Sequence, residues 1–132
     1  MDQPSANQPN IQVLIVDDTA TTRENLKKLL YFVHDIVALG TAANGEEGIQ
    51  MTVELQPDIV LLDVDMPGVD GITATQRIIE QVPTAQVILM FTQDKADYQQ
   101  RCDRAGAKAY LVKPFDGVEL EATIRRAYQQ RN

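Results

Sequence analysis

Four short apolar runs of the sequence end in side chains that could do chemistry. The first run ends at Asp17 and Asp18, a later one at Asp63, and the last two at Thr92 and Lys113. Three carboxylates brought together repel one another unless a cation neutralises them. Oxygen ligands without His or Cys select a hard ion, Mg²⁺ or Mn²⁺, over zinc. Because Mg²⁺ takes only one or two carboxylates directly, room is left for a phosphate oxygen.

The same side chains are complementary to a phosphoryl group. Lys113 adds a second positive centre beside the ion, and Thr92 adds a hydroxyl donor. A carboxylate can act as the nucleophile that forms an aspartyl phosphate. Asp63 is the best candidate for that role, because it ends the central apolar run and can face both the metal ion and Lys113.

Alternating strands and helices must position these residues. Apolar runs typical of strands buried on both faces alternate with segments of helical periodicity. The expected strands cover residues 11–16, 36–39, 58–62, 86–91 and 109–112, and the expected helices begin near residues 21, 44, 72, 94 and 116. This repetition predicts an α/β fold, a parallel sheet with helices on both faces. Ligands of such sheets bind beyond the carboxyl ends of the strands, where the candidate residues stand.

Two local patterns predict how the first and last helices are built. Thr21 and Glu24 have the spacing of a capping box, which places the start of the first helix at Thr21. The last helix, 116–128, is expected to bury four side chains: Val118, Ala122, Ile124 and Ala127.

Composition and charge exclude several classes of function. The 132 residues carry a formal net charge of −7, which disfavours direct binding to nucleic acid or to an anionic membrane. Cys102 is the only cysteine, so an intramolecular disulfide and a Cys-based zinc site are excluded. No apolar run approaches the roughly 20 residues of a membrane span, and the first residues do not resemble a signal peptide. We therefore expect no membrane insertion, a cytoplasmic location, and a disordered lead-in over residues 1–10.

Four motifs follow one another in a specific order along the chain. They are VLIVDD at 13–18, LLDVDMPGVDG at 61–71, FT at 91–92 and AGAKAYLVKPF at 105–115. With these motifs the chain resembles the receiver domain of bacterial two-component response regulators over about residues 11–130. The resemblance implies a flavodoxin-like, doubly wound parallel sheet of five strands in the order 2-1-3-4-5, with five helices.

The resemblance implies a metal site for Mg²⁺ or Mn²⁺. Asp18 would bind the ion directly, and Asp17 would bind it directly or through water. Asp63 would be a further ligand as well as the phosphoacceptor, and the backbone carbonyl of Asp65 would complete the protein ligands.

The resemblance also implies a phosphoryl site and a switch. Thr92 and Lys113 would contact the phosphoryl oxygens, and Thr92 and Tyr110 would together change conformation on phosphorylation of Asp63. The family's Lys-Pro bond is commonly cis, which suits the Lys113–Pro114 bond because only an X–Pro bond makes the cis form accessible at small cost.

The implied function is that of a signalling domain, not of an enzyme acting on other substrates. A sensor histidine kinase or a phosphotransfer protein would donate the phosphoryl group from a phosphohistidine, since the chain has no nucleotide-binding glycine loop. The surface of residues 94–105, 109–112 and 116–128 would then change and control a partner, an attached output domain or a second copy of the chain.

Two features bear on the subfamily. The family usually has a small residue directly after the switch residue, here Thr92, whereas this chain has Gln93. We expect the bulk of Gln93 to narrow the path by which a phosphodonor reaches Asp63. The stretch 91–115 also looks like receivers attached to pilus-assembly ATPases of the tight-adherence type.

Two alternatives use the same residues. Asp63 and Asp65 form the D-x-D with which haloacid-dehalogenase-type phosphohydrolases begin, but Pro67 stands where those enzymes usually have Thr or Val. Such enzymes also normally carry a cap insertion, for which 132 residues leave no room. A receiver-like domain used only for protein contact is the second alternative, and the full set of site residues disfavours it.

Overall fold

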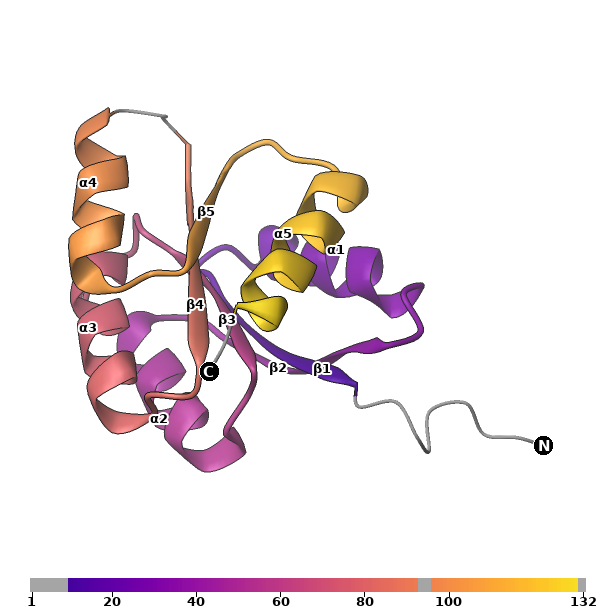
Figure 1. Ribbon diagram of the computed structural model, residues 1–132, viewed down its shortest axis with the longest axis horizontal. Helices are drawn as coiled ribbons and strands as arrows, with labels where there is room; N and C mark the ends of the chain where they lie inside the picture. Colours follow the sequence, from indigo (N-terminus) through magenta and orange to yellow (C-terminus); the bar gives the residue numbers. More distant parts are fainter. Residues whose placement is uncertain (1–9, 93–95, 131–132) are drawn as a thin grey trace.

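The computed structural model of the chain describes residues 10–92 and 96–130, in which five strands alternate with five helices (Figure 1). The expected lead-in, apart from residue 10, and Gln93 lie outside these residues. The elements are β1 (Ile11–Val16), α1 (Ala20–Tyr31), β2 (Ile36–Ala42), α2 (Gly45–Leu55), β3 (Ile59–Asp63), α3 (Gly71–Gln81), β4 (Gln86–Phe91), α4 (Ala96–Ala105), β5 (Ala109–Val112) and α5 (Gly117–Gln129).

The strands form one parallel sheet in the order β2-β1-β3-β4-β5, which confirms the predicted topology. β2 extends three residues beyond its expected end at Leu39. The reason is a register shift opposite Val13 and Leu14, after which Gly40 and the two residues that follow it continue to pair with β1.

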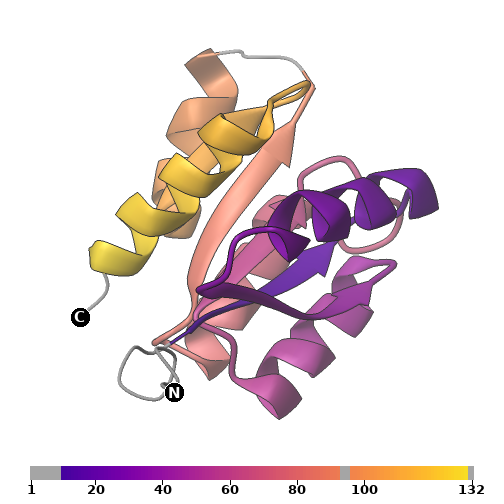
Figure 2. The ribbon, with the colours of Figure 1, turned by 90° about the vertical axis from the view of Figure 1, so that its right-hand side faces the viewer.

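Helices cover both faces of the sheet, as Figures 1 and 2 show: α2, α3 and α4 lie on one face, and α1 and α5 on the other. Each face has its own apolar cluster. The first includes Ile49 of α2, Ile78 of α3 and Cys102 of α4. The second includes Leu26 and Leu30 of α1 with side chains of α5. All residues of β3 and β4 are buried, as expected for strands covered on both sides.

The alternation of side chains along a strand assigns the chemical residues to one of these faces. Asp17, Asp63 and Lys113 each follow, by two residues, a side chain of the cluster under α1 and α5: Ile15, Leu61 and Leu111. Residues two apart on a strand point to the same face. The three groups therefore lie at the carboxyl edge of the sheet, after β1, β3 and β5, and on the side of α1 and α5.

The capping box expected at Thr21 is wrong. α1 begins at Ala20, and Thr19 is its N-cap residue, without a side-chain cap. The backbone N–H of Thr19 donates to the carboxylate of Asp17, and the backbone N–H of Arg23 donates to the carbonyl of Thr19. These two bonds close the first turn earlier than the local motif predicts.

The buried face of α5 was half predicted. Ile124 and Ala127 are buried, but Val118 is 79% exposed and Ala122 is exposed. The side chains buried with Ile124 and Ala127 are those of Leu120 and Thr123. Positions 120, 124 and 127 follow the helical repeat, whereas Val118 lies in the first turn, on the opposite side.

Gly71 lets α3 begin directly against the end of β3. A Cβ atom at position 71 would lie 2.6 Å from the carbonyl oxygen of Asp63 and 2.6 Å from Cα of Val64. Both contacts are to backbone, which cannot rotate away. The backbone N–H of Gly71 donates to the carbonyl of Val64 at 3.1 Å, so helix and strand end are joined at this point.

We predict that Gly71→Ala destabilises the fold by about 1–3 kcal/mol, because the added methyl group overpacks the backbone around Asp63. Gly117→Ala is the matched control, since Gly117 also begins a helix after an aspartate N-cap. Its Cβ would meet only the side chain of Leu29, at 3.4 Å. Urea unfolding of the two variants measures the difference, and equal stabilities would contradict the close approach at Gly71.

Candidate functional site

Three carboxylates meet at the carboxyl edge of the sheet. Asp17 and Asp18 follow β1, and Asp63 ends β3, the neighbouring strand. One oxygen from each carboxylate lies within 4.8 Å of the others. Asp17 is completely buried and Asp63 is 5% exposed, whereas Asp18 is exposed. The cluster therefore has two inner carboxylates and one at its mouth.

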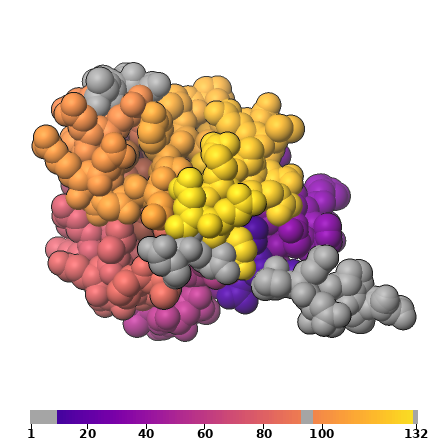
Figure 3. Space-filling model, in the orientation of Figure 1, coloured from indigo at the N-terminus to yellow at the C-terminus, as the bar shows by residue number. Residues whose placement is uncertain are grey.

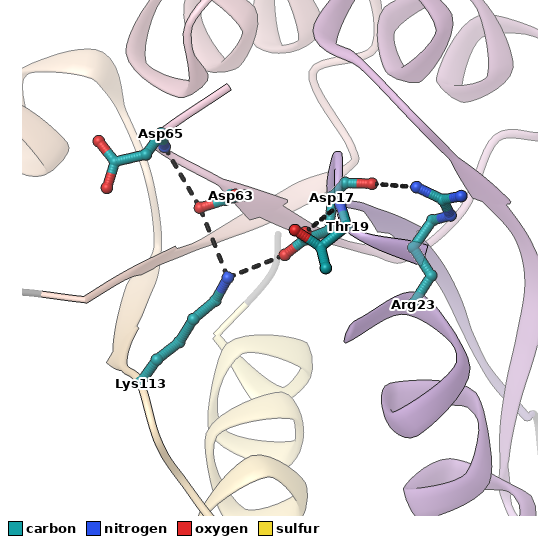
Figure 4. A network of polar contacts seen from close by, with 6 residues as sticks. All are labelled: Asp17, Thr19, Arg23, Asp63, Asp65 and Lys113. Atoms are coloured by element: carbon teal, nitrogen blue, oxygen red, sulfur yellow. Dashed lines mark hydrogen bonds and ion pairs between the residues drawn. The ribbon is translucent and has the colours of Figure 1, made fainter. Parts of the chain in front are cut away.

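Lys113 joins the two inner carboxylates from the end of β5 (Figure 4). Its ammonium Nζ donates to Oδ2 of Asp17 at 2.9 Å and lies 3.7 Å from Oδ1 of Asp63. One ammonium cannot neutralise three carboxylates, so the arrangement is short of positive charge. The Lys113–Pro114 bond is cis, as the resemblance implies.

Both carboxylate oxygens of Asp17 and both of its backbone polar groups have hydrogen-bond partners. Its carboxylate accepts the backbone N–H of Thr19 at 2.9 Å in addition to the Lys113 ammonium. Its own N–H donates to the carbonyl of Ala42 in β2 at 3.1 Å. Its carbonyl accepts Nη1 of Arg23, which reaches back from α1 at 2.7 Å (Figure 4). Arg23 is not among the site residues that the motifs predict, because an arginine in a first helical turn usually faces solvent.

The contacts that stabilise the negative charge of Asp63 are longer than those of Asp17. Its Oδ1 accepts the backbone N–H of Asp65 at 3.2 Å, and the Asp65 carboxylate points away from it (Figure 4). Burial raises the pKa of Asp63 from its ordinary 3.8 to about 6, and the negative charges of Asp17 and Asp18 act in the same direction. The Lys113 ammonium and the Asp65 N–H oppose the rise in the pKa.

The residues of the cluster fit a small, hard cation. All candidate side-chain ligands are carboxylate oxygens, which suit Mg²⁺. Mg–O distances near 2.1 Å allow about 4.2 Å between opposite ligands. The spread of up to 4.8 Å therefore requires a small side-chain adjustment or one ligand bound through water. A bound divalent ion would supply the missing positive charge, with Asp17, Asp18 and Asp63 as the residues that hold it.

The two predicted switch residues lie in different surroundings. Thr92 follows β4 and is exposed, and among the described residues no hydrogen bond joins it to the carboxylates. Tyr110 of β5 is half-buried, and its ring stacks on that of Phe91, with 5.4 Å between centroids. Both rings belong to the cluster under α2, α3 and α4, on the other face of the sheet from Asp63.

Comparison with known sequences gives a consistent match. The family model of the response regulator receiver domain matches residues 13–125. The transcriptional regulatory protein LiaR of Bacillus subtilis is 36% identical over 117 residues, which are 89% of this chain and 56% of LiaR. Protein-glutamate methylesterase/protein-glutamine glutaminase 4 of Hahella chejuensis is 37% identical over 125 residues, 92% of this chain and 32% of that protein. The chain thus spans about a third of the length of one of these relatives and just over half of the other.

Solved structures agree with the sequence matches. The response regulator domain of Thermotoga maritima CheB superposes with a TM-score of 0.86 at 30% identity, over 93% of this chain and 99% of that one. A chain of the CheX–CheY–BeF3–Mg²⁺ complex of Borrelia burgdorferi superposes with a TM-score of 0.86 at 31% identity, over 93% and 92% of the two chains. Within residues 10–92 and 96–130, no helix is both long and apolar enough to span a membrane.

We predict that Asp63→Asn stabilises the metal-free protein above pH 6. Because the pKa of Asp63 is higher in the folded chain than in the unfolded chain, the folded state binds more protons between pH 4 and 6. Ionisation of Asp63 therefore costs stability as the pH rises through this window, and the loss is complete above it. At about 1.36 kcal/mol per pH unit, the cost approaches about 2–3 kcal/mol.

Urea unfolding in EDTA at pH 4 and at pH 7.5 measures this effect. The stability difference between Asp63→Asn and the wild type should be small at pH 4 and large at pH 7.5. Asp65→Asn is the control, since its carboxylate is exposed and lies two residues from the same strand end. A difference for Asp63→Asn that does not change with pH would contradict the unfavourable charge at this position.

Proposed function

The chain belongs to the response regulator receiver family, and we propose on this basis that its Asp63 accepts a phosphoryl group in a Mg²⁺-dependent reaction. The proposal rests on one observation: a buried carboxylate whose pKa is raised to about 6 lies 3.7 Å from the Lys113 ammonium and within reach of two further carboxylates. This combination supports the role of a nucleophile, because the surrounding groups can receive a cation and a phosphoryl oxygen.

The proposed reaction transfers a phosphoryl group from the imidazole of a phosphohistidine to the carboxylate of Asp63. A carboxylate oxygen of Asp63 forms a bond to phosphorus while the bond from phosphorus to the donor's imidazole nitrogen breaks, and that nitrogen retains the bonding electron pair. Bound Mg²⁺ would neutralise charge on the carboxylates and on the transferred group. The Lys113 ammonium is placed to stabilise negative charge on a phosphoryl oxygen. The hydrogen bond from the Asp65 N–H keeps one Asp63 oxygen fixed, so the other oxygen is the expected nucleophile.

A groove beside Lys113 suits the docking of the phosphodonor protein. It runs between α1 and the segment after β5 and is mainly apolar, lined by Thr22, Asn25, Leu26, Leu29, Lys113, Pro114 and Phe115. Val118 adjoins this segment in sequence and is 79% exposed. We propose that a sensor histidine kinase or a phosphotransfer protein covers this groove and presents its phosphohistidine to Asp63.

The proposed role is signalling, not catalysis on other substrates. The relative from Hahella chejuensis is a methylesterase, but the chain matches only 32% of it. The described sheet and helices are those of a receiver domain. We propose that the chain catalyses only its own phosphorylation and dephosphorylation, and that it does so in the cytoplasm.

We predict that acetyl phosphate with Mg²⁺ adds the mass of one phosphoryl group to the wild type and none to Asp63→Asn. The amide that this substitution introduces cannot act as the nucleophile, so no acyl phosphate forms at position 63. Intact-mass spectrometry before and after addition of EDTA measures both the addition and its dependence on the metal ion.

Asp65→Asn is the matched control, since it removes a carboxylate from the same loop without removing the nucleophile. It should still gain one phosphoryl group. Labelling of Asp63→Asn to the extent of the wild type would show that another residue is the acceptor. Steady release of phosphate without accumulation of the modified protein would favour a phosphohydrolase instead.

We further propose that phosphorylation changes the surface formed by α4, β5 and α5, which is continuous in Figure 3 (orange to yellow). Thr92 immediately follows Phe91, and the Phe91 ring lies against Tyr110. Movement of the Thr92 hydroxyl toward a phosphoryl group on Asp63 would shift the end of β4 and the stacking on its other face. Tyr110 would then change its position, and the altered surface would bind an output domain, a partner or a second copy.

We predict that fluorine-labelled Tyr110 shifts its NMR resonance when beryllofluoride and Mg²⁺ bind at Asp63. The stacked ring of Phe91 makes the label sensitive to small rotations of Tyr110. Thr92→Ala should reduce the shift, because the hydroxyl that would respond to the bound group is gone. An unmoved Tyr110 resonance, with binding at Asp63 confirmed, would mean that this tyrosine is only a structural residue.

A further inference from the structure

The Asp18 carboxylate is at the mouth of the cluster and is not fixed by its own contacts. It is exposed, and between described residues it makes no hydrogen bond or ion pair. Asp17, its neighbour in the chain, has both carboxylate oxygens occupied, by the N–H of Thr19 and the ammonium of Lys113. Among the described residues, only the backbone of Asp18 is therefore held, and it sets the point and the Cα–Cβ direction from which the side chain extends.

Arg23 controls that backbone at the peptide unit between Asp17 and Asp18. The carbonyl of Asp17 and the N–H of Asp18 belong to one planar group, so the direction of the carbonyl also sets the direction of the N–H. Nη1 of Arg23 donates to this carbonyl at 2.7 Å, a short hydrogen bond from a charged donor (Figure 4). The guanidinium is partly buried and is attached to the first turn of α1.

We propose that Arg23 is a positioning residue for the metal site. By holding the peptide plane between Asp17 and Asp18, it directs the exposed Asp18 carboxylate toward the ion and keeps it 4.8 Å or less from the carboxylates of Asp17 and Asp63. This role rests on the proposed function, because it requires that the three carboxylates bind Mg²⁺. Residues that orient a metal ligand typically change metal affinity by about tenfold or more when they are removed.

The charge of Arg23 would have the opposite effect on metal binding. A cation close to the cluster repels Mg²⁺, so its removal without any change in geometry would strengthen binding. Removal of a positioning residue weakens binding, because Asp18 then samples directions away from the ion. The two roles are therefore separated by the sign of the change in the dissociation constant.

The test is a MgCl₂ titration followed by the amide resonances of residues at the site. The variants are Arg23→Met, which removes donor and charge, and Arg23→Lys, which keeps the charge and one donor group. Lys28→Met is the matched control, because it removes one positive charge from an exposed position of the same helix. Thermal unfolding without metal identifies any loss of stability and confirms that each variant is folded at the titration temperature.

The expected result is a Kd for Mg²⁺ about tenfold higher in Arg23→Met than in the wild type. The Kd of Arg23→Lys should lie closer to the wild type, and that of Lys28→Met should be unchanged or lower. An Arg23→Met variant that binds Mg²⁺ as tightly as the wild type, or more tightly, would overturn the positioning role. An Arg23→Lys variant as weak as Arg23→Met would also count against the hydrogen bond. Absence of binding by the wild type would instead overturn the proposed metal site.

Discussion

The Lys113 ammonium contacts two of the three carboxylates at the carboxyl edge of the sheet. Among the described residues, it is the only cation that forms an ion pair with this cluster. Its shorter contact is to Asp17, which has no exposed surface. Asp63 receives the longer contact, and its pKa is raised accordingly by burial and by neighbouring negative charge. The fold thus holds Asp63 as a buried, incompletely neutralised carboxylate, at a cost to its own stability, and this is the group that we propose as the phosphoacceptor.

Strand pairing, the close packing of α3 on β3, and a contact between α5 and the segment after α1 together build the surroundings of this cluster. Parallel pairing of β1 with β3 brings Asp17 and Asp63 to one edge, and β5 brings Lys113 across 96 positions of sequence. α3 packs on the end of β3 only because Gly71 has no side chain. α1 and α5, the helices on the same face as the site, are also linked away from it. Arg125 of α5 donates two hydrogen bonds of 2.8 Å to the carboxylate of Asp35, which follows α1.

The parallel α/β class and the convergence at the sheet edge could be predicted from the apolar runs and the residues that end them, whereas the strand order came from the family resemblance. The start of α1 could not be predicted, since the N–H of Thr19 bonds to Asp17, whose direction depends on Lys113 far along the chain. Arg23 was missed for a different reason: its partner is a backbone carbonyl, which no sequence pattern marks. The exposed Val118 was misassigned because apolar character alone does not tell which face of α5 meets the sheet.

Chemical trapping of the phosphorylated residue tests the central claim, that the under-compensated carboxylate is the acceptor. The protein is treated with acetyl phosphate and Mg²⁺, reduced with borohydride, which converts an aspartyl phosphate to homoserine, and digested for peptide mass mapping. The account predicts homoserine at position 63 and intact aspartate at positions 17, 18 and 65. Homoserine at any of those three positions, with Asp63 unmodified, would contradict it.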